Sequence, residues 1–126
     1  MATIKYSRQR EAIKTYMEST TSHPTADTVY EHIKKIYPNI SLGTVYRNLN
    51  FLVEHGELIK LSCEDNKEHY DANTTPHSHF YCRCCHQVLD LDVPIANLEH
   101  LSDEVQFQGK IETCVMFYIG TCPDCM

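Results

Sequence analysis

The chain has 126 residues, of which 42% are hydrophobic, and a formal net charge of −6 at pH 7. This length is enough for one ordinary domain or two very small ones, so each half can bury only a modest core unless a metal or a partner subunit stabilises it. No stretch approaches the roughly 18 to 20 apolar residues that span a membrane, and the first residues lack the apolar core of a signal peptide, so we expect a cytoplasmic protein without a membrane partner.

The charge is unevenly distributed along the chain. Residues 1–56 contain seven basic and five acidic residues, whereas residues 57–126 contain four basic and twelve acidic residues. The first part therefore has a net charge of +2 and the second a net charge of −8. Because phosphate binding needs clustered lysine and arginine, any contact with nucleic acid is expected in the first half.

Three helices are expected in the first half. Ser7 can cap a helix whose apolar residues recur at helical spacing. A second helix should follow Thr25 and stop at Pro38, because proline cannot continue a helix. A third should begin after Ser41 and end at Gly56. The apolar faces of the second and third helices are predicted to contain Val29, Ile33, Ile36, Tyr37, Leu42, Val45, Leu49, Leu52 and Val53.

After Gly56 the pattern changes to the alternation of strands, with strands expected at residues 57–62 and 69–71 around a polar turn at 65–67. Three helices followed by a hairpin is the order of a winged helix. Asn73-Thr74-Thr75-Pro76 has the composition of a linker. Beyond it we expect strands at residues 79–82, 87–92 and 110–119 and a helix after Pro94. The fold class is therefore α+β, with domains at residues 1–72 and 79–126 joined by a hinge at 73–78.

Four of the seven cysteines form two C-x-x-C pairs, Cys82 with Cys85 and Cys122 with Cys125. Four thiolates in two tight knuckles match a tetrahedral zinc ion and leave no open position, which indicates a structural site. An iron ion in the same all-sulfur cage and two unrelated cysteine pairs are the alternatives. Cys84 lies inside the first knuckle, but the spacing favours Cys82 and Cys85 as ligands.

A second group of candidate ligands surrounds His77 and His79. Alternate residues of a strand point to the same face, so these two imidazoles can reach one ion. Asp71 precedes them, Asp90 follows them, and His23 lies in the helical half. Imidazole and carboxylate ligands without sulfur favour Fe²⁺, Mn²⁺ or Zn²⁺. Taken alone, a solvated strand face is the commoner explanation of such a histidine pair.

The third expected helix carries polar residues opposite its apolar face. At 100° per residue, Arg47 and Asn50 lie on the polar face, and Thr44 and Tyr46 flank it. Arginine can bind guanine, asparagine can bind adenine, and tyrosine or threonine can contact a thymine methyl group or a phosphate. This makes Thr44, Tyr46, Arg47 and Asn50 candidate DNA-binding residues. An ordinary solvated helix face explains the same pattern.

Four motifs together closely resemble the Fur superfamily of bacterial metal-dependent transcription regulators, in order and across nearly the whole chain: residues 23–27, 41–49, 77–82 and 122–125. The resemblance implies a homodimeric repressor of operator DNA, with an N-terminal winged-helix DNA-binding domain and a small C-terminal α/β dimerisation domain, and not an enzyme. It also implies structural Zn²⁺ on the four cysteines and a regulatory Fe²⁺ or Mn²⁺ between the domains. By motif, the regulatory ligands are His23, Asp71, His77, His79 and Asp90.

Within this superfamily, the H-x-H before the first knuckle and the aspartate at position 90 resemble the peroxide-sensing (PerR-type) branch. That branch implies derepression after iron-catalysed oxidation of His23 or His77. Regulators of iron or zinc uptake usually show H-H-D-H and a glutamate at these positions. The alternatives are an iron, manganese or zinc uptake regulator that senses metal occupancy and, more remotely, a non-haem iron enzyme.

The chain departs from the superfamily at a few positions. His86 stands where relatives normally have glycine, at a point where a positive φ is convenient. Thr113 and Cys114 stand where relatives usually carry histidine, so a further metal site of some relatives is not expected. Cys63 and Cys114 are expected to be ordinary strand residues that pack. His69 is expected to be a surface or core histidine.

Overall fold

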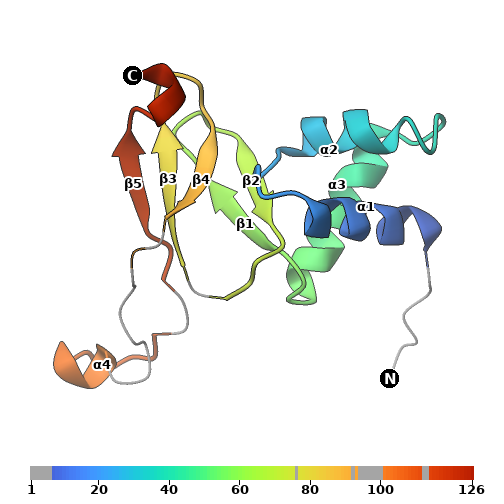
Figure 1. Cartoon of the computed structure of the whole chain (residues 1–126). Helices are drawn as coiled ribbons and strands as arrows, with labels where there is room; N and C mark the ends of the chain where they lie inside the picture. Colours follow the sequence, from blue (N-terminus) through green and yellow to red (C-terminus); the bar gives the residue numbers. More distant parts are fainter. Residues whose placement is uncertain (1–6, 76, 92, 94–100, 112–113) are drawn as a thin grey trace, which may run out of the picture. The chain divides into compact units, whose positions relative to one another are not determined.

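We describe a computed structural model of the chain, which covers residues 7–75, 77–91, 93, 101–111 and 114–126. The chain divides into two compact units, residues 1–74 and 75–126 (Figure 1). The division falls within residues 73–78, and the action of this segment as a hinge stays a prediction. None of the helices in the described ranges is both long enough and apolar enough to cross a membrane.

Three helices begin the first unit: α1 (Arg8–Ser19), α2 (Ala26–Ile33) and α3 (Leu42–Glu54). Each begins at the predicted capping residue, because the side-chain oxygens of Ser7, Thr25 and Ser41 accept hydrogen bonds from backbone N–H groups three residues later. Such caps satisfy N–H groups that have no partner inside the helix. Gly56, with φ of +74°, follows α3 as expected.

The predicted extent of α2 is wrong at its C-terminal end. The helix ends at Ile33, and tighter turns follow in which the N–H groups of Lys35 and Ile36 donate to carbonyls only three residues back, those of His32 and Ile33. These turns shift the angular position of the residues that follow. Ile36 consequently lies 56% exposed and does not join the apolar face on which it was expected.

The three helices pack around one apolar core, which α1, α2 and α3 all contribute to. Burying a leucine, isoleucine or valine side chain in this core contributes roughly 1.5 to 3 kcal/mol to the free energy of folding, before the cost of chain ordering is counted. Phe51 lies at the edge of this core, with the Arg10 guanidinium 4.1 Å from its ring centroid and the His55 ring stacked on it. The buried residues are Ile13, Met17, Ala26, Val29, Ile33, Ile40, Val45, Leu49, Leu52, Leu58 and Tyr70.

A hairpin of β1 (Ile59–Ser62) and β2 (Glu68–Asp71) completes the first unit and confirms the winged-helix order. The strands are antiparallel, and Leu61 pairs with His69. The segment before α2 also runs alongside β2, because Thr25 and His69 form an isolated antiparallel bridge and the N–H of Tyr70 donates to the carbonyl of Pro24. Residues 23–25 are therefore held against β2.

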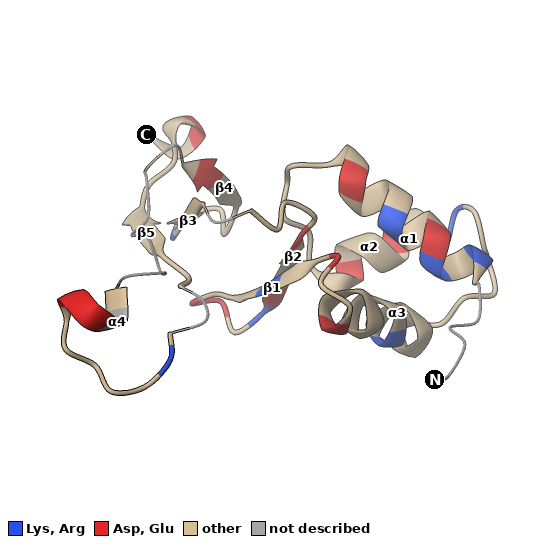
Figure 2. Ribbon diagram, turned by 90° about the horizontal axis from the view of Figure 1, so that it is seen from below, with Lys and Arg blue, Asp and Glu red and all other residues tan. Residues whose placement is uncertain are grey.

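The second unit contains β3 (Ser78–Cys82), β4 (Val88–Leu91), the short helix α4 (Leu101–Glu104), β5 (Phe117–Gly120) and a 3-10 turn at Pro123–Cys125. The sheet order is β4-β3-β5, with β4 antiparallel and β5 parallel to β3. Figure 2 shows acidic residues on α4 and α2, whereas basic and acidic residues both occur along α1 and α3. The α+β fold class is confirmed.

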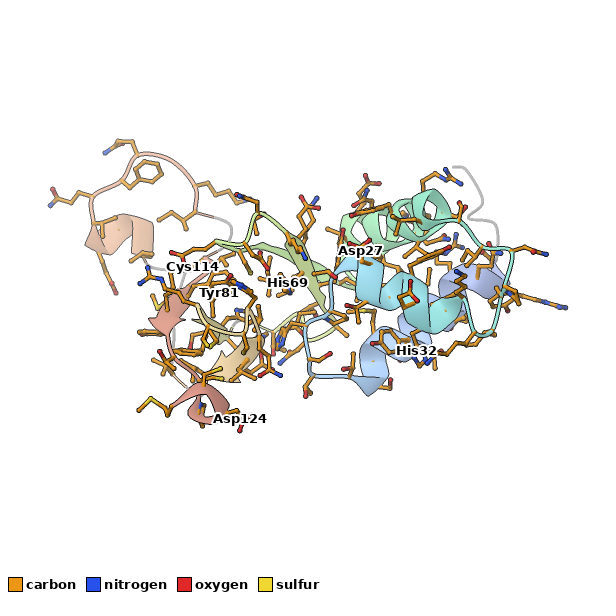
Figure 3. All side chains as sticks on the ribbon, turned by 90° about the horizontal axis from the view of Figure 1, so that it is seen from above. Asp27, His32, His69, Tyr81, Cys114 and Asp124 are labelled. Carbon is orange, nitrogen blue, oxygen red and sulfur yellow. The ribbon has the colours of Figure 1, made fainter. Side chains whose placement is uncertain are left out.

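Two expectations for the second unit need correction. The strand expected at residues 110–119 forms only at Phe117–Gly120, where it pairs with His79–Cys82 of β3; residues 112–113 lie outside the described part. Of the helix expected after Pro94, residues 94–100 lie outside the described part and α4 is the portion seen. Cys63 and Cys114 were expected in strands, but both lie outside them. Cys114 is labelled in Figure 3.

Candidate metal centres and nucleic-acid interface

The four cysteines of the two C-x-x-C pairs converge in the second unit. Cys82 ends β3, and Cys85 follows in the adjacent turn. Cys122 directly precedes the 3-10 turn, and Cys125 is its last residue. Their sulfur atoms lie within 4.8 Å of one another, and those of Cys85 and Cys122 are 3.8 Å apart. A tetrahedron with metal–sulfur bonds of 2.3 Å has edges of about 3.8 Å. The donor set and its spacing therefore fit a zinc ion.

Neighbouring groups change the pKa values of the thiols in this site. The N–H groups of Cys85 and Cys122 lie 3.5 Å and 3.3 Å from the sulfur of Cys82 and lower the pKa of its thiol from 9.0 to about 6. Cys125 shows the opposite effect, because hydrogen bonding to the neighbouring Cys122 sulfur raises the pKa of its thiol. Four thiolates cannot share so small a volume without a positive charge. A bound dication supplies that charge.

The turn after the first knuckle contains His86, at the position where the family resemblance implies glycine. His86 adopts a φ of +64°, the left-handed conformation that favours glycine. Its N–H donates to the carbonyl of Cys82 at 2.8 Å, and its Nδ1 lies 2.7 Å from the Tyr81 hydroxyl oxygen. Cys84, in the same turn, is exposed. The side-chain contact with Tyr81 helps to hold a backbone conformation that is unfavourable for histidine.

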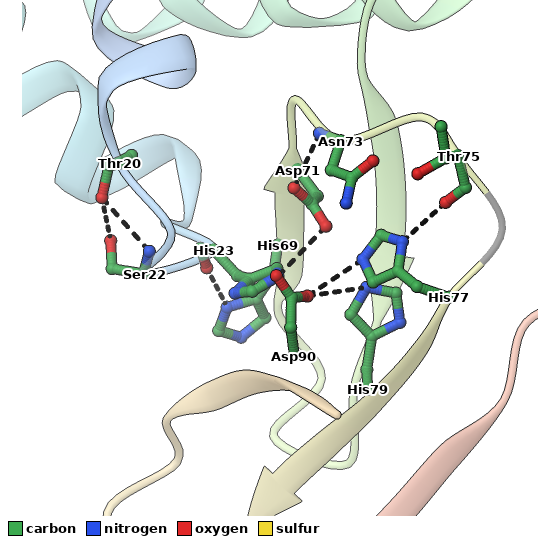
Figure 4. Close-up of polar contacts among 10 residues, drawn as sticks. All are labelled: Thr20, Ser22, His23, His69, Asp71, Asn73, Thr75, His77, His79 and Asp90. Atoms are coloured by element: carbon green, nitrogen blue, oxygen red, sulfur yellow. Dashed lines mark hydrogen bonds and ion pairs between the residues drawn. The ribbon is translucent and has the colours of Figure 1, made fainter. Parts of the chain in front are cut away.

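In the first unit, His23 and Asp71 form a buried pair. The register that pairs Thr25 with His69 brings His23 opposite Asp71, and the His23 Nε2 lies 3.1 Å from an Asp71 carboxylate oxygen (Figure 4). The other carboxylate oxygen accepts a hydrogen bond from the N–H of Asn73. His23 is 2% exposed and has a φ of +52°, which is uncommon for a residue with a side chain. Such strained positions occur often at functional sites.

In the second unit, His77, His79 and Asp90 form a corresponding group. Asp90 on β4 lies directly opposite His79 on β3, and one of its oxygens is 2.9 Å from the His77 Nε2 and 3.7 Å from the His79 Nε2 (Figure 4). The His77 Nδ1 lies 2.6 Å from the carbonyl oxygen of Thr75, to which it donates. This bond directs Nε2 toward the carboxylate, an arrangement typical of histidine ligands. Nitrogen and oxygen donors of this kind fit Fe²⁺, Mn²⁺ or Zn²⁺.

The candidate DNA-binding residues lie along α3. Tyr46, Arg47 and Asn50 are exposed, whereas Val45 and Leu49 on the opposite face are buried. The Arg47 guanidinium donates to the Thr44 hydroxyl at 2.9 Å. The helix thus presents an arginine, an asparagine and a tyrosine on one accessible surface, as its periodicity predicts.

A further group of ligand-type side chains was not predicted from the sequence. Cys63, Asp65 and His69 meet at the β1–β2 turn, where one potential ligand atom from each lies within 4.8 Å of the others. His69 is 5% exposed, and it belongs to a buried polar cluster instead of the apolar core or the surface. The signal was present as C-x-D-x-x-x-H across a turn, but the strand register is needed to see that these residues meet.

Comparison with known proteins places the chain in a family. The model of the ferric uptake regulator family matches residues 1–117. The chain belongs to the ferric uptake regulator (Fur) family. Among curated relatives, the peroxide-responsive repressor PerR of Staphylococcus epidermidis is 33% identical over 125 residues, covering 98% of this chain and 83% of that protein. PerR of Staphylococcus aureus is 32% identical over 129 residues, covering 98% of this chain and 84% of that protein.

Solved structures of Fur-family regulators share the fold. The peroxide stress regulator of Campylobacter jejuni gives a TM-score of 0.77 at 32% identity, covering 93% of this chain and 88% of that one. The ferric uptake regulator of Helicobacter pylori gives a TM-score of 0.78 at 25% identity, covering 97% of this chain and 82% of that one. The chain is therefore a metal-responsive regulator of the Fur family and not an enzyme. Its cysteine and histidine–aspartate groups have the chemistry of metal sites.

Proposed function

We propose that this Fur-family chain is a metal-dependent repressor that binds operator DNA as a homodimer and responds to peroxide through oxidation of a histidine ligand. The observation that carries the peroxide-sensing part is Asp90. It supplies a short carboxylate directly opposite His79, in a chain whose relatives in two Staphylococcus species are named as peroxide-responsive repressors. A shorter carboxylate than glutamate changes how an ion is held and leaves it an accessible position.

In this proposal, His23 and Asp71 of the first unit and His77, His79 and Asp90 of the second hold one Fe²⁺ or Mn²⁺, while the four cysteines hold structural Zn²⁺. Within each unit an imidazole nitrogen already faces a carboxylate oxygen. The distance is 3.1 Å from the His23 Nε2 to Asp71 and 2.9 Å from the His77 Nε2 to Asp90. Because the ligands come from both units, binding selects one arrangement of the units. A coupling of about 1 to 3 kcal/mol would change operator affinity roughly 5- to 150-fold.

The peroxide response consumes one ligand. Fe²⁺ bound to these residues would supply the electron transfer that activates peroxide. The O–O bond of hydrogen peroxide then breaks: one oxygen atom bonds to a ring carbon of His23 or His77, which is oxidised by two electrons, and the other oxygen leaves as water with the hydrogen displaced from that carbon. The resulting 2-oxo-histidine is a poorer ligand, so the affinity for metal and for operator DNA both fall.

The test compares the wild-type chain with Asp90→Glu after loading with Fe²⁺ or Mn²⁺. Low peroxide should add one oxygen, seen by mass spectrometry, to the peptide that contains His23 or His77 in the wild-type Fe²⁺ form. The Mn²⁺ form should stay unmodified, and Asp90→Glu should bind DNA with metal but be oxidised much less. Asp103→Glu, the same change at an exposed position of α4, is the matched control and should behave as wild type.

A metal-uptake regulator is the competing function, which the similarity in fold to the Helicobacter pylori ferric uptake regulator favours. Under that alternative, operator binding follows metal concentration and not peroxide. Wild-type Fe²⁺ protein that stays unoxidised and bound to DNA under low peroxide would contradict the peroxide-sensing proposal and favour this alternative.

For operator recognition, we propose that Thr44, Tyr46, Arg47 and Asn50 contact DNA. Arg47→Ala should weaken operator binding by about 1 to 3 kcal/mol and relax the preference at one base pair if the guanidinium binds guanine. If it contacts only phosphate, binding to all sequences should weaken equally and the salt dependence should fall by about one ion. Lys35→Ala removes the same charge from an exposed position just after α2 and should have little effect.

For dimerisation, the exposed apolar residues of the second unit are the proposed interface. Tyr118 and Ile119 are 41% and 42% exposed on β5, which lies at the edge of the described sheet. Exposed apolar edge strands tend to associate. Ile119→Asp should yield monomers in sedimentation experiments, whereas Ile36→Asp, the same change at a more exposed site in the first unit, should leave dimers intact.

A further inference from the structure

The β1–β2 turn contains a group of potential ligands that the proposed function does not use. The ligand atoms of Cys63, Asp65 and His69 lie within 4.8 Å of one another. His69 is buried and Cys63 and Asp65 are partly buried, and the side chains of Asp65 and His69 are only 9% and 7% exposed. It is therefore a built cluster within the first unit and not a chance meeting of surface side chains.

The hairpin itself brings the three residues together. Leu61 is the cross-strand partner of His69, and Cys63 lies two residues beyond Leu61, so Cys63 and His69 point to the same face of the hairpin. The turn is closed by hydrogen bonds from the N–H of Asn66 to the carbonyl of Cys63 and from the N–H of Cys63 to the carbonyl of Lys67. Asn66 has a φ of +60°, which lets the chain reverse over so few residues.

Hydrogen bonds to backbone groups orient the ligand atoms of His69 and Asp65. The His69 Nδ1 lies 2.7 Å from the carbonyl oxygen of His23 and donates to it, which directs Nε2 to the Asp65 carboxylate, 3.2 Å away. The other Asp65 oxygen accepts a hydrogen bond from the N–H of Lys67 at 3.0 Å. A histidine that binds a metal ion usually donates its other ring N–H to a backbone carbonyl or a carboxylate, as the His69 Nδ1 does here.

We propose that Cys63, Asp65 and His69 form an additional binding site for Zn²⁺. Zinc is the common divalent ion that accepts thiolate, imidazole and carboxylate together, whereas Mg²⁺, Ca²⁺ and Mn²⁺ prefer oxygen. In a tetrahedral site, nitrogen and oxygen ligands about 2.05 Å from zinc lie about 3.3 Å apart, close to the 3.2 Å between His69 and Asp65. Three protein ligands leave the fourth position to water.

The site is expected to differ from the four-cysteine centre in its affinity for zinc. Burial, with the charge of Asp65 adding to it, raises the pKa of the Cys63 thiol to about 11, so the thiol proton must leave when zinc binds. Zinc should therefore bind less tightly here than at the four cysteines and more tightly as the pH rises. The bound ion would also hold His69 against the carbonyl of His23.

The experiment adds Co²⁺ to the full-length chain, in a non-thiol reductant, with zinc retained at the four cysteines. Absorption from a single thiolate bound to Co²⁺ should appear within two equivalents of metal, because the proposed regulatory ligands can also take one ion but contain no sulfur and so give no thiolate band. Two further equivalents of Zn²⁺ should remove the band. Cys63→Ser should abolish the band and lower zinc affinity at this site at least about tenfold, and Asp65→Asn should weaken it.

Matched variants separate this site from the others. Cys114→Ser and Cys84→Ser should keep the band, and so should His77→Ala, which damages only the regulatory ligand set. Metal analysis confirms one retained zinc per chain, and circular dichroism confirms that each variant is folded. The proposal is overturned if no thiolate band forms, if it survives in folded Cys63→Ser, or if Cys114→Ser or Cys84→Ser removes it.

Discussion

Replacing His86 tests how the first cysteine knuckle tolerates a left-handed residue. His86 has a φ of +64°, and a left-handed backbone costs about 1 to 2 kcal/mol for a residue with a side chain. The contact with the Tyr81 hydroxyl, at 2.7 Å, offsets about 0.5 to 1.5 kcal/mol of this cost. The two contributions act in opposite directions and can be measured separately.

His86→Gly removes both the strain and the side-chain contact, and it increases the freedom of the unfolded chain by about 0.4 to 1 kcal/mol. These effects nearly cancel, so the free energy of unfolding should stay within about 1 kcal/mol of wild type. His86→Ala keeps the strained backbone and loses only the contact, so it should destabilise by about 0.5 to 1.5 kcal/mol. Tyr81→Phe removes the same contact from the other side and should cost a similar amount.

The assay is denaturant unfolding of zinc-loaded protein at a fixed free zinc concentration, with zinc release to a chromogenic chelator as the signal of the second unit. The glycine variant should release zinc at a higher denaturant concentration than the alanine variant. An alanine variant that is as stable as, or more stable than, the glycine variant would show that backbone strain at this turn is not significant. An unchanged Tyr81→Phe protein would show that the hydroxyl contact contributes nothing.

Three further predictions concern stability. Leu49→Ala, at a fully buried position of α3, should lower the free energy of unfolding of the first unit by about 2 to 5 kcal/mol in denaturant titrations. A loss below about 1 kcal/mol would contradict the described core. Ser41→Ala should cost about 1 kcal/mol and Ser41→Gly only a few tenths, since the hydroxyl accepts the N–H of Thr44; equal losses would argue against the cap. Cys122→Ser should release zinc and unfold the second unit, as measured by circular dichroism, whereas Cys84→Ser at an exposed position should do neither. A folded, zinc-free Cys122→Ser chain would exclude a structural role for the zinc ion.

Local sequence signals located the helices of the first unit well. Ser7, Thr25 and Ser41 begin helices because capping depends on residues only three positions apart. The C-terminal end of α2 was placed too late, because Pro38 marks where a helix must stop and not where the tighter turns after Ile33 begin. The extent of β5 is also not visible locally, since β5 forms by pairing with β3, far away in the sequence.

The candidate sites also contain some residues that local sequence patterns reveal and others that only the fold brings together. The C-x-x-C spacing and the alternation of His77 and His79 are visible locally, and the structure brings the four cysteines together and directs both histidines at Asp90. The pairing of His23 with Asp71 spans 48 residues and was reached only through the family resemblance. The group at the β1–β2 turn was missed because Cys63 and His69 share a face only in one strand register.

The bridge between Thr25 and His69 also determines which insertions and deletions the first unit can accept. Alternate residues of a strand face opposite sides, so one residue inserted between His69 and Asp71 would turn the Asp71 carboxylate away from His23. A residue inserted in the loop before His23 leaves this register unchanged. Sequence alignments of distant relatives should therefore place gaps outside residues 23–25 and 69–71, and a relative with an unavoidable gap between the positions of His69 and Asp71 should lack this pair.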